Sequence, residues 1–174
     1  MSSRTALPTL HGEHVTIRPP APGEIDDLAV AMATDPETSP WWSKDPETIR
    51  RWFADSAYQV LVVEEAGSAA GVVAFEEVTD PDYHAAGMDI SLLSCCVGRG
   101  LGTEALRLLG VWLIDERGHH RLTIDPALAN TRAVHTYEKV GFLPIGVARQ
   151  YERGPDGAWH DNLLMDVLAD EFVR

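Results

Sequence analysis

Three alternate glycines stand directly before a run with the composition of a helix. In CCVGRGLGTEALRLL (residues 95–109), a loop has no side chain at Gly98, Gly100 and Gly102. Apolar, helix-forming residues follow from Thr103. Such a loop exposes backbone N–H groups at a helix N-terminus, where unpaired amides and the helix dipole attract an anion. The chemistry that this segment predicts is the binding of a phosphate.

Two common phosphate motifs do not fit this loop. A Walker A loop needs a lysine after its last glycine, and no lysine follows any glycine of this chain. A dinucleotide-binding fingerprint needs Gly-x-Gly-x-x-Gly, which the spacing from Gly98 to Gly102 does not match. A seat for the pyrophosphate of coenzyme A remains, to which Arg99 adds a charged donor. For the loop taken alone, a turn that only starts a helix is the structural alternative.

A second segment, NTRAVHTYEKVGF (residues 130–142), adds an independent motif. Together with the glycine loop, it resembles the GNAT superfamily of acyl-CoA-dependent N-acyltransferases, over roughly residues 13–168 in element order. The family's loop carries Gln or Arg where this chain has Val97. We expect the backbone amides to bind the phosphates regardless, with Arg99 as a substitute side-chain donor.

The resemblance implies a coenzyme A site. The loop is expected to hold the pyrophosphate, and the segment that begins at Asn130 is expected to face the cofactor. The cofactor-binding residues implied in this way are Leu93, Cys95, Val97, Gly98, Arg99, Gly100, Leu101, Gly102, Thr103, Asn130, Ala133 and Tyr137. Acetyl-CoA is the expected co-substrate, and no metal is expected.

The chain looks most like the aminoglycoside 6′-N-acetyltransferases within this superfamily. The likeness rests on GMDISLL (residues 87–93), on TIDP (residues 123–126) and on the pair Trp41-Trp42. It implies transfer of an acetyl group to the 6′-amine of aminoglycoside antibiotics, by direct attack of the amine in a ternary complex, as a form of resistance. Acetyltransferases of ribosomal-protein N-termini share the loop but generally lack the acidic strand residue and the Asp-Pro turn.

Asp89 and Tyr137 are the expected catalytic residues. Asp89 lies on the strand that runs into the loop, which places it near the acetyl group as a general base; alternatively, it only orients the amine. Tyr137 fits the family's general acid, which protonates the departing thiolate; alternatively, it is a buried tyrosine with a structural hydrogen bond. A backbone N–H near Leu93 is expected to polarise the acetyl carbonyl.

An aminoglycoside carries several ammonium groups, so its site needs carboxylates and an aromatic face. The expected substrate-binding residues are Trp41, Trp42, Glu76, Asp89, Asp125 and Asp161. Each has a structural alternative: Asp125 suits a turn cap, the tryptophans suit the core, and Glu76 and Asp161 suit solvated surface.

Composition narrows the class of function further. With 27 acidic and 14 basic residues the net charge is −13, which disfavours nucleic acid and anionic membranes as partners. A polycationic substrate and a requirement for solubility explain this charge equally well. The adjacent Cys95 and Cys96 do not suit an ordinary disulfide, and with the lack of an apolar signal core at the N-terminus they indicate the cytoplasm. The histidines, including His119 and His120, lack metal-ligand spacing and suit the surface or local packing.

We expect a single GNAT domain over residues 1–174, whose helices and strands position these residues. Hydrophobic periodicity and turn signals give the order β-α-α-β-β-β-α-β-α-β-β. The expected fold class is α+β (mixed α/β), with a mixed, mostly antiparallel sheet of about seven strands and about four helices. The helix after the loop is predicted over residues 103–116, and the next helix is predicted to be capped by Asn130 and stopped at Gly141.

Two other functions are compatible with these motifs. One is an acetyltransferase for a different cationic amine, such as a polyamine or a protein N-terminus. The other is a non-catalytic regulatory module that binds coenzyme A. Val97 favours the module, whereas the presence of both Asp89 and Tyr137 opposes it, because neither is required for holding the cofactor. A monomer or a homodimer is expected.

Overall fold

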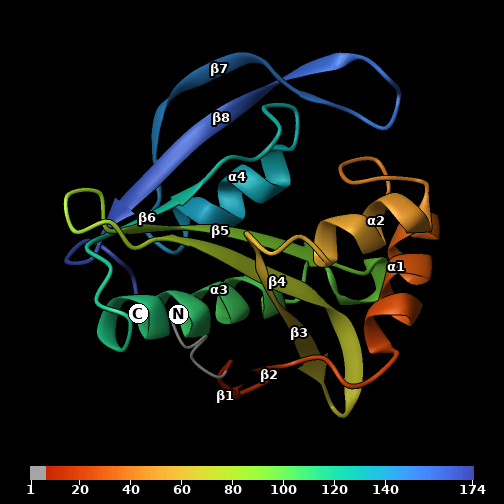
Figure 1. Ribbon diagram of the computed structural model, residues 1–174, viewed down its shortest axis with the longest axis horizontal. Coiled ribbons are helices and arrows are strands. Elements are labelled where there is room, and N and C mark those ends of the chain that lie inside the picture. The colour runs from red at the N-terminus through yellow and green to blue at the C-terminus, as the bar shows by residue number, and fades with distance from the viewer. Residues whose placement is uncertain (1–6) are drawn as a thin grey trace.

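An eight-stranded sheet carries four α-helices in the computed structural model, which describes residues 7–174 (Figure 1). Residues 1–6, which belong to the expected domain and to the segment in which no signal core was expected, lie outside the described residues. The strands are β1 (Leu10–His11), β2 (Val15–Arg18), β3 (Gln59–Glu65), β4 (Ser68–Val78), β5 (Ala85–Leu92), β6 (Arg121–Ile124), β7 (Leu143–Arg153) and β8 (Trp159–Leu168). The helices are α1 (Glu24–Thr34), α2 (Pro46–Phe53), the 3₁₀ turn η1 (Ser94–Cys96), α3 (Leu101–Asp115) and α4 (Thr131–Glu138).

The strand order in the sheet is β1-β2-β3-β4-β5-β6-β8-β7, and every neighbouring pair is antiparallel except β5 and β6. This confirms the mixed, mostly antiparallel sheet and the four helices. The eighth strand is the addition, because β1 has only two residues, which pair with β2 at the sheet edge. Two residues are too few for a period-two pattern to reveal.

Alternation along β3 and β4 explains how both faces of the sheet are covered. On one face, the side chains pack with α3 and α4 in a cluster that includes Leu61, Val63, Val73 and Phe75. On the other face, they pack with α1 and α2 in a cluster that includes Val60, Val62, Val72 and Ala74. Burying each of the larger side chains stabilises the fold by roughly 1.5–3 kcal/mol. The sheet is thus a rigid central layer between two sets of helices.

The parallel pair β5 and β6 is short, and it opens a gap in the sheet. The two strands are in register only at Ala86–Leu122 and Gly87–Thr123. Strand β5 continues to Leu92, paired with β4 on its other side. The second half of β5 therefore turns one backbone edge toward open space rather than toward a neighbouring strand.

Two helices begin beside this gap. Helix α3 starts at Leu101, two residues earlier than predicted, because Gly100 is its N-cap with a φ of 84°, a left-handed conformation that favours glycine. Helix α4 is capped as predicted: the Asn130 side chain accepts a hydrogen bond from the Ala133 N–H. After α4, Gly141 adopts a φ of 102° and ends the segment.

None of the helices within residues 7–174 has the length and apolar character that crossing a bilayer requires.

Candidate functional site

A cavity of about 230 Å³ lies against the glycine loop, and we call it the loop cavity. The end of β5, the first turn of α3 and one face of α4 surround it. Eight of the residues predicted to bind the cofactor line it, namely Val97, Gly98, Gly100, Gly102, Thr103, Asn130, Ala133 and Tyr137. The two sequence motifs therefore meet at one cavity.

The loop cavity presents backbone amides instead of side chains. The first N–H groups of α3 have no acceptor within the helix and emerge beside Gly100, Gly102 and Thr103, which line the cavity. A Cβ at Gly102 would lie 3.4 Å from Leu92 Cδ1 and 3.8 Å from Ile90 Cδ1, so glycine keeps the cavity floor open. Unpaired amides at a helix N-terminus suit a phosphate group.

Four residues predicted to bind the cofactor do not line this cavity, namely Leu93, Cys95, Arg99 and Leu101. The Arg99 guanidinium forms a bidentate ion pair with Glu65, with N–O distances of 2.7 and 2.5 Å, so it does not replace the donor missing at Val97. Leu101, the first residue of α3, is buried in the core. Cys95 is exposed and does not line the cavity.

The backbone N–H that is available to a carbonyl in this part of β5 is that of Leu92, one residue before the predicted Leu93. The Leu93 N–H donates to the Ala70 carbonyl at 2.9 Å and so serves the sheet. Because successive N–H groups of an extended strand point to opposite sides, the N–H of Leu92 points into the gap beyond β5, and Leu92 lines the loop cavity.

Basic side chains on α4 and at its C-cap line the loop cavity, and the sequence motifs do not include them. Arg132, His135 and Lys139 all line it. Their spacing of three and four residues puts them on one face of a helix, which is the signal that would have found them. Arg132 also forms an ion pair with Glu37, at 2.5 Å. Because Glu37 also lines the loop cavity and neutralises Arg132, the positive charge added beside the amides is that of Lys139.

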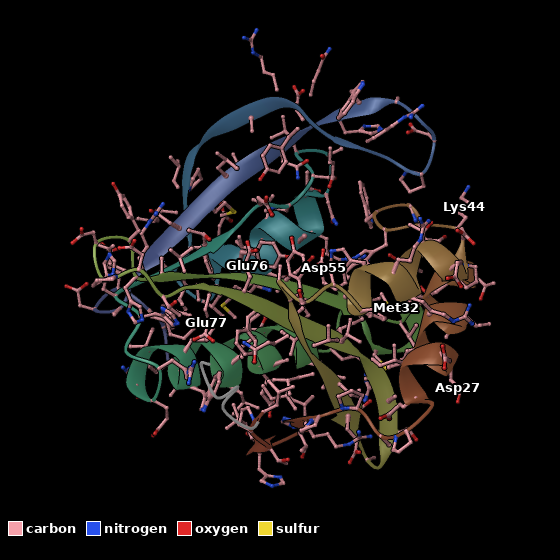
Figure 2. The ribbon with its side chains drawn as sticks, viewed as in Figure 1. Asp27, Met32, Lys44, Asp55, Glu76 and Glu77 are labelled. Carbon is pink, nitrogen blue, oxygen red and sulfur yellow. The ribbon has the colours of Figure 1, made fainter. Side chains whose placement is uncertain are left out.

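A second cavity, of about 410 Å³, is lined by four carboxylates, and we call it the acidic cavity. Glu76, Asp89, Asp125 and Glu152 contribute to its wall from β4, β5, the end of β6 and β7. Glu76 and its neighbour Glu77 lie on opposite faces of the sheet (Figure 2), so only Glu76 reaches this cavity. Among the described residues, no Lys or Arg forms an ion pair with any of the four.

Burial raises the pKa values of Asp89, Asp125 and Glu152, and neighbouring negative charges add to the shift at Asp89 and Glu152. Burial raises the pKa of Asp89 to about 7; a hydrogen bond from the Ile90 N–H, 2.7 Å long, opposes this, and the charges of Asp125 and Glu152 add to it. Burial also raises the pKa of Asp125 and of Glu152. Such a cluster gains stability when a cation enters it.

The aromatic wall of the acidic cavity differs from the one predicted. Trp52 and Tyr58 line this cavity, with stacked rings whose centroids are 4.7 Å apart. Trp41 and Trp42, expected in this place, line the loop cavity. Trp42 supports the wall from behind, because its ring meets the Trp52 ring edge-on at 4.5 Å. The order of Trp42, Trp52 and Tyr58 in space depends on the docking of α2, which no local pattern reveals.

Asp161 was also predicted to bind substrate, but it lies outside the acidic cavity. Its carboxylate accepts a hydrogen bond from the Gln150 N–H at 2.7 Å. Glu152 lines the acidic cavity instead. The register of β7 against β8 shifts between Ala148 and Glu152, where Gln150 has a φ of 50°. Such a bulge redirects the side chains that follow it, and a regular alternation cannot predict that.

Consecutive residues of β5 line the two cavities, and we call this point the junction. Asp89 lines the acidic cavity, and the next residue, Ile90, lines the loop cavity. Tyr137 is buried on the loop-cavity side, and burial, followed by the charges of Asp89 and Asp125, raises the pKa of its hydroxyl far above the ordinary value. A carboxyl that titrates near neutrality and a hydroxyl that stays protonated therefore flank one junction.

Other candidate groups do not form a site of this kind. Cys95 and Cys96 are free thiols. His119 is buried, is hydrogen-bonded to Glu77 at 2.8 Å and stacks on His84, which is the local packing expected of it. Within residues 7–174, no group of three His, Cys, Asp or Glu side chains is arranged to hold a metal ion.

Comparison with known proteins agrees with this geometry. The chain matches the model of an acetyltransferase (GNAT) domain over residues 14–143. Over 84 residues it is 39% identical to the kanamycin resistance protein of Rhizobium radiobacter, an alignment that covers 48% of this chain and 72% of that protein. It is 38% identical over 84 residues to the aminoglycoside N(6′)-acetyltransferase type 1 of Klebsiella pneumoniae, covering 48% of this chain and 39% of that protein.

A longer alignment relates the chain to another acetyltransferase. It is 34% identical over 155 residues to the mycothiol acetyltransferase of Salinispora arenicola, which covers 81% of this chain and 48% of that protein. The chain thus spans less than half the length of two of these curated relatives.

A solved structure shares the fold along nearly the whole chain. The spermidine N-acetyltransferase from Vibrio cholerae, solved in complex with CoA and spermine, superimposes with a TM-score of 0.76 at 20% identity, covering 92% of this chain and 98% of that one. The match to the family model covers most of this chain. It includes both sequence motifs and strand β5, which lines both cavities. The chain therefore belongs to the GNAT acetyltransferase family.

Proposed function

We propose that the protein transfers the acetyl group of acetyl-CoA to the 6′-amine of an aminoglycoside, a modification that confers antibiotic resistance. The observation that carries the proposal is the junction on β5, where the acidic cavity, with four carboxylates that lack ion-pair partners among the described residues, adjoins the loop cavity. Relatives named for kanamycin resistance and for aminoglycoside N(6′)-acetylation support the choice of acceptor. The free thiols of Cys95 and Cys96 suit the reducing cytoplasm in which we expect the protein to act.

The hydrogen-bond donors that line the loop cavity suit acetyl-CoA. Amides of the first α3 turn suit the pyrophosphate, glycines at positions 98, 100 and 102 let it approach the backbone, and Lys139 adds positive charge. Acetyl-CoA, when bound, supplies the acetyl group as a reactive thioester. No residue that lines this cavity indicates a different acyl donor.

The acidic cavity fits a molecule with several ammonium groups. Asp125 and Glu152 would each bind one ammonium group, while Trp52 and Tyr58 present aromatic faces to a sugar ring or a cation. A cation bound there would offset the burial that raises the pKa values of Asp89, Asp125 and Glu152, and the repulsion that adds to the shift at Asp89 and Glu152.

Residues at the junction would carry the proton transfers. Asp89, with a pKa of about 7, accepts a proton from the acceptor ammonium at its carboxylate. The Leu92 N–H, directed into the gap, donates a hydrogen bond where negative charge develops on the acetyl oxygen. The Tyr137 hydroxyl keeps its proton through the neutral range and donates it to the departing sulfur. No side-chain nucleophile is required, so the reaction is a direct transfer.

Another cationic amine is the second candidate acceptor. The mycothiol acetyltransferase relative aligns over a larger share of this chain than the aminoglycoside-modifying relatives do, and the four carboxylates would also bind a polyamine. A regulatory module without turnover is the weakest alternative, because the acidic cavity and the Asp89–Tyr137 junction serve no purpose in holding coenzyme A alone.

The test is thiol release from acetyl-CoA with a panel of amines, namely kanamycin, spermidine and a peptide with a free N-terminus, with the acetylated product identified by mass spectrometry. We expect turnover with kanamycin to exceed that with the other two. Spermidine or peptide acetylation without kanamycin acetylation would overturn the proposed acceptor, and no turnover with any amine would favour the regulatory module.

A further inference from the structure

The two cysteines of the chain point their sulfur atoms toward one another. The Cys95 and Cys96 Sγ atoms are 3.3 Å apart in η1, and both thiols are free. Cys95 is exposed, so a reagent in solution can reach the pair, whereas Cys96 is buried. The sequence contains only two cysteines. All thiol chemistry of this protein therefore occurs at this pair.

Hydrogen bonds hold the turn that carries these thiols. The Cys96 N–H donates to the Leu93 carbonyl at 2.8 Å, and the Ser94 N–H donates to Asp35 Oδ2 at 2.9 Å. The Leu93 N–H is bonded in turn to the Ala70 carbonyl. The turn is thus tied to β4 and to the end of α1, so the two sulfurs are presented together without further ordering of the chain.

This geometry disfavours a direct disulfide between the two sulfurs. A trans peptide fixes the Cα atoms of neighbouring residues about 3.8 Å apart, and no peptide bond among the described residues is cis. Disulfides usually need about 4.4–6.8 Å between Cα atoms, and an S–S bond of about 2.05 Å. Closing the gap from 3.3 Å to that bond length requires the two side chains and the turn to rearrange.

A bridge through one additional atom fits the same geometry without rearrangement. A thiophilic centre with bonds to sulfur of about 2.3 Å spans this separation at an angle of roughly 90°. Pyramidal trivalent arsenic forms such near-right angles, and soft thiol ligands favour it over hard, oxygen-seeking cations. Two sulfur ligands and a third, non-protein group complete its coordination, so no further side chain is needed.

We propose that Cys95 and Cys96 form a vicinal dithiol site that binds trivalent arsenicals. An arsenic(III) centre that carries an oxygen condenses with both thiols: two As–S bonds form, the As–O bonds break, and both thiol protons leave in water. The arsenic remains trivalent and no electrons are transferred, so no oxidant is required. Burial, together with the neighbouring Cys95, raises the pKa of the Cys96 thiol to about 11, so this thiol enters the condensation with its proton.

The site is also connected to the loop cavity. Val97 and Gly98 follow Cys96 directly and line that cavity. An arsenical bound to the pair places its third substituent beside this segment and prevents the loop from adjusting to a phosphate. We expect occupancy to weaken acetyl-CoA binding, a consequence that rests on the proposed function.

The experiment uses phenylarsine oxide as the probe, in the presence of excess monothiol, with intact-mass spectrometry of the native protein. The expected result is one adduct per chain, with the gain of one phenylarsenic group and the loss of two hydrogens. It should resist the monothiol and be removed by a small dithiol such as dithiothreitol. Two adducts per chain, or removal by the monothiol, would overturn the proposal, as would rapid formation of an internal disulfide with a mild oxidant.

Single-cysteine variants provide the control. Cys95→Ser changes an exposed side chain and should keep the fold, while lowering affinity for the probe at least about a hundredfold, because the second bond is no longer intramolecular. Cys96→Ala should do the same, with circular dichroism as its folding check. Equal affinity in wild type and Cys95→Ser would contradict the proposal.

Calorimetry with acetyl-CoA separates the two parts of the inference. Weaker binding to the modified than to the unmodified protein supports the connection, and equal binding refutes it. If even the unmodified protein does not bind acetyl-CoA, the proposed function fails, whereas the arsenical adduct is judged by its own mass measurement.

Discussion

Asp89 lies where consecutive residues of β5 line the acidic cavity and the loop cavity. It belongs to the acidic cavity, and its neighbour Ile90 belongs to the loop cavity. Its carboxylate accepts a hydrogen bond from the Ile90 N–H, so the side chain is held at the junction. A pKa of about 7 leaves a substantial fraction of both protonation states near neutrality, which suits a proton acceptor.

Replacing this carboxyl tests whether it is a base or only orients the amine. Asp89→Asn keeps an acceptor for the Ile90 N–H, and we expect kcat to fall by roughly 10²–10⁴-fold with a smaller change in KM, as loss of a general base does. For wild type, kcat/KM should rise with pH up to about 7 and then level off, and the variant should lose that inflection. A rise in KM with kcat preserved would assign Asp89 to orientation.

The same substitution has a predictable effect on stability. Because the folded-state pKa of Asp89 is raised to about 7, its stabilising contribution is complete below the unfolded value of about 3.9 and is lost as pH rises through about 7. Asp89→Asn should therefore melt at a higher temperature than wild type at pH 8, with a smaller difference at pH 4. Calorimetric scans at both pH values measure this.

Tyr137 is a second residue whose hydroxyl can be removed without disturbing the packing. Its buried ring lies edge-on to Phe142 at 6.3 Å, a contact that Tyr137→Phe preserves. We expect a loss in kcat of about 10²-fold, with a nearly unchanged KM for acetyl-CoA and an unchanged melting temperature. A melting temperature that falls together with kcat would point to a structural hydrogen bond instead of proton donation.

At the scale of elements, two glycines of the loop have separable tasks. Gly100 caps α3 at a φ of 84°, and a Cβ there would meet no other atom within 4 Å, so Gly100→Ala should cost about 1 kcal/mol in backbone strain, or roughly 2–4 °C in Tm. Gly102 lies within α3, and a methyl group there would make ordinary contact at 3.4 Å with Leu92. Gly102→Ala should therefore keep stability but weaken acetyl-CoA binding. Equal loss of stability in both variants would contradict this division.

Asn162 on β8 links the two elements that carry Asp125 and Glu152. Its Nδ2 donates to the Asp125 carbonyl at 2.7 Å, and its side chain is hydrogen-bonded to Glu152. Asn162 is 2% exposed, so Asn162→Ala should cost about 1–3 kcal/mol and raise KM for the amine more than it lowers kcat. Chemical denaturation and steady-state kinetics check the two effects.

A matched variant separates packing from charge at this position. Asn162→Asp keeps the volume but adds a carboxyl beside Asp125 and Glu152, so its stability should fall as pH rises. A pH-independent loss in both variants would mean that only packing matters.

The sequence predicts the elements of this fold well because each depends on local signals. Asn130 as a cap and the glycines before α3 are recognisable from neighbouring residues alone, and both occur as expected. Trp52 and Glu152 were missed because their places depend on tertiary geometry. Trp52 reaches the acidic cavity through the docking of α2, and Glu152 through a bulge around Gln150. Arg99 was misassigned because its partner, Glu65, is 34 residues away in the chain.

At the scale of the whole molecule, the net charge of −13 and the acidic cavity act in the same direction. A polycation should be attracted through long-range forces that salt screens, since the Debye length shortens from about 10 Å at 0.1 M to about 3 Å at 1 M. We expect KM for a multiply charged amine to rise steeply with ionic strength, and KM for a singly charged amine to change little. Steady-state kinetics across a salt series, at fixed acetyl-CoA, provide the measurement. A salt-independent KM for both amines would show that the charge serves solubility alone.

The proposed acceptor of the acetyl group is a single atom, the 6′ nitrogen of the aminoglycoside. The most direct measurement is kcat/KM for two aminoglycosides that differ only in carrying an amine or a hydroxyl at the 6′ position, with the product's acetylation site assigned by NMR. We expect acetylation at the 6′ nitrogen of the first compound, and a kcat/KM at least about a thousandfold lower for the second, because the reacting amine is absent. Equal turnover of the two compounds, or acetylation at a different amine of the first, would contradict it.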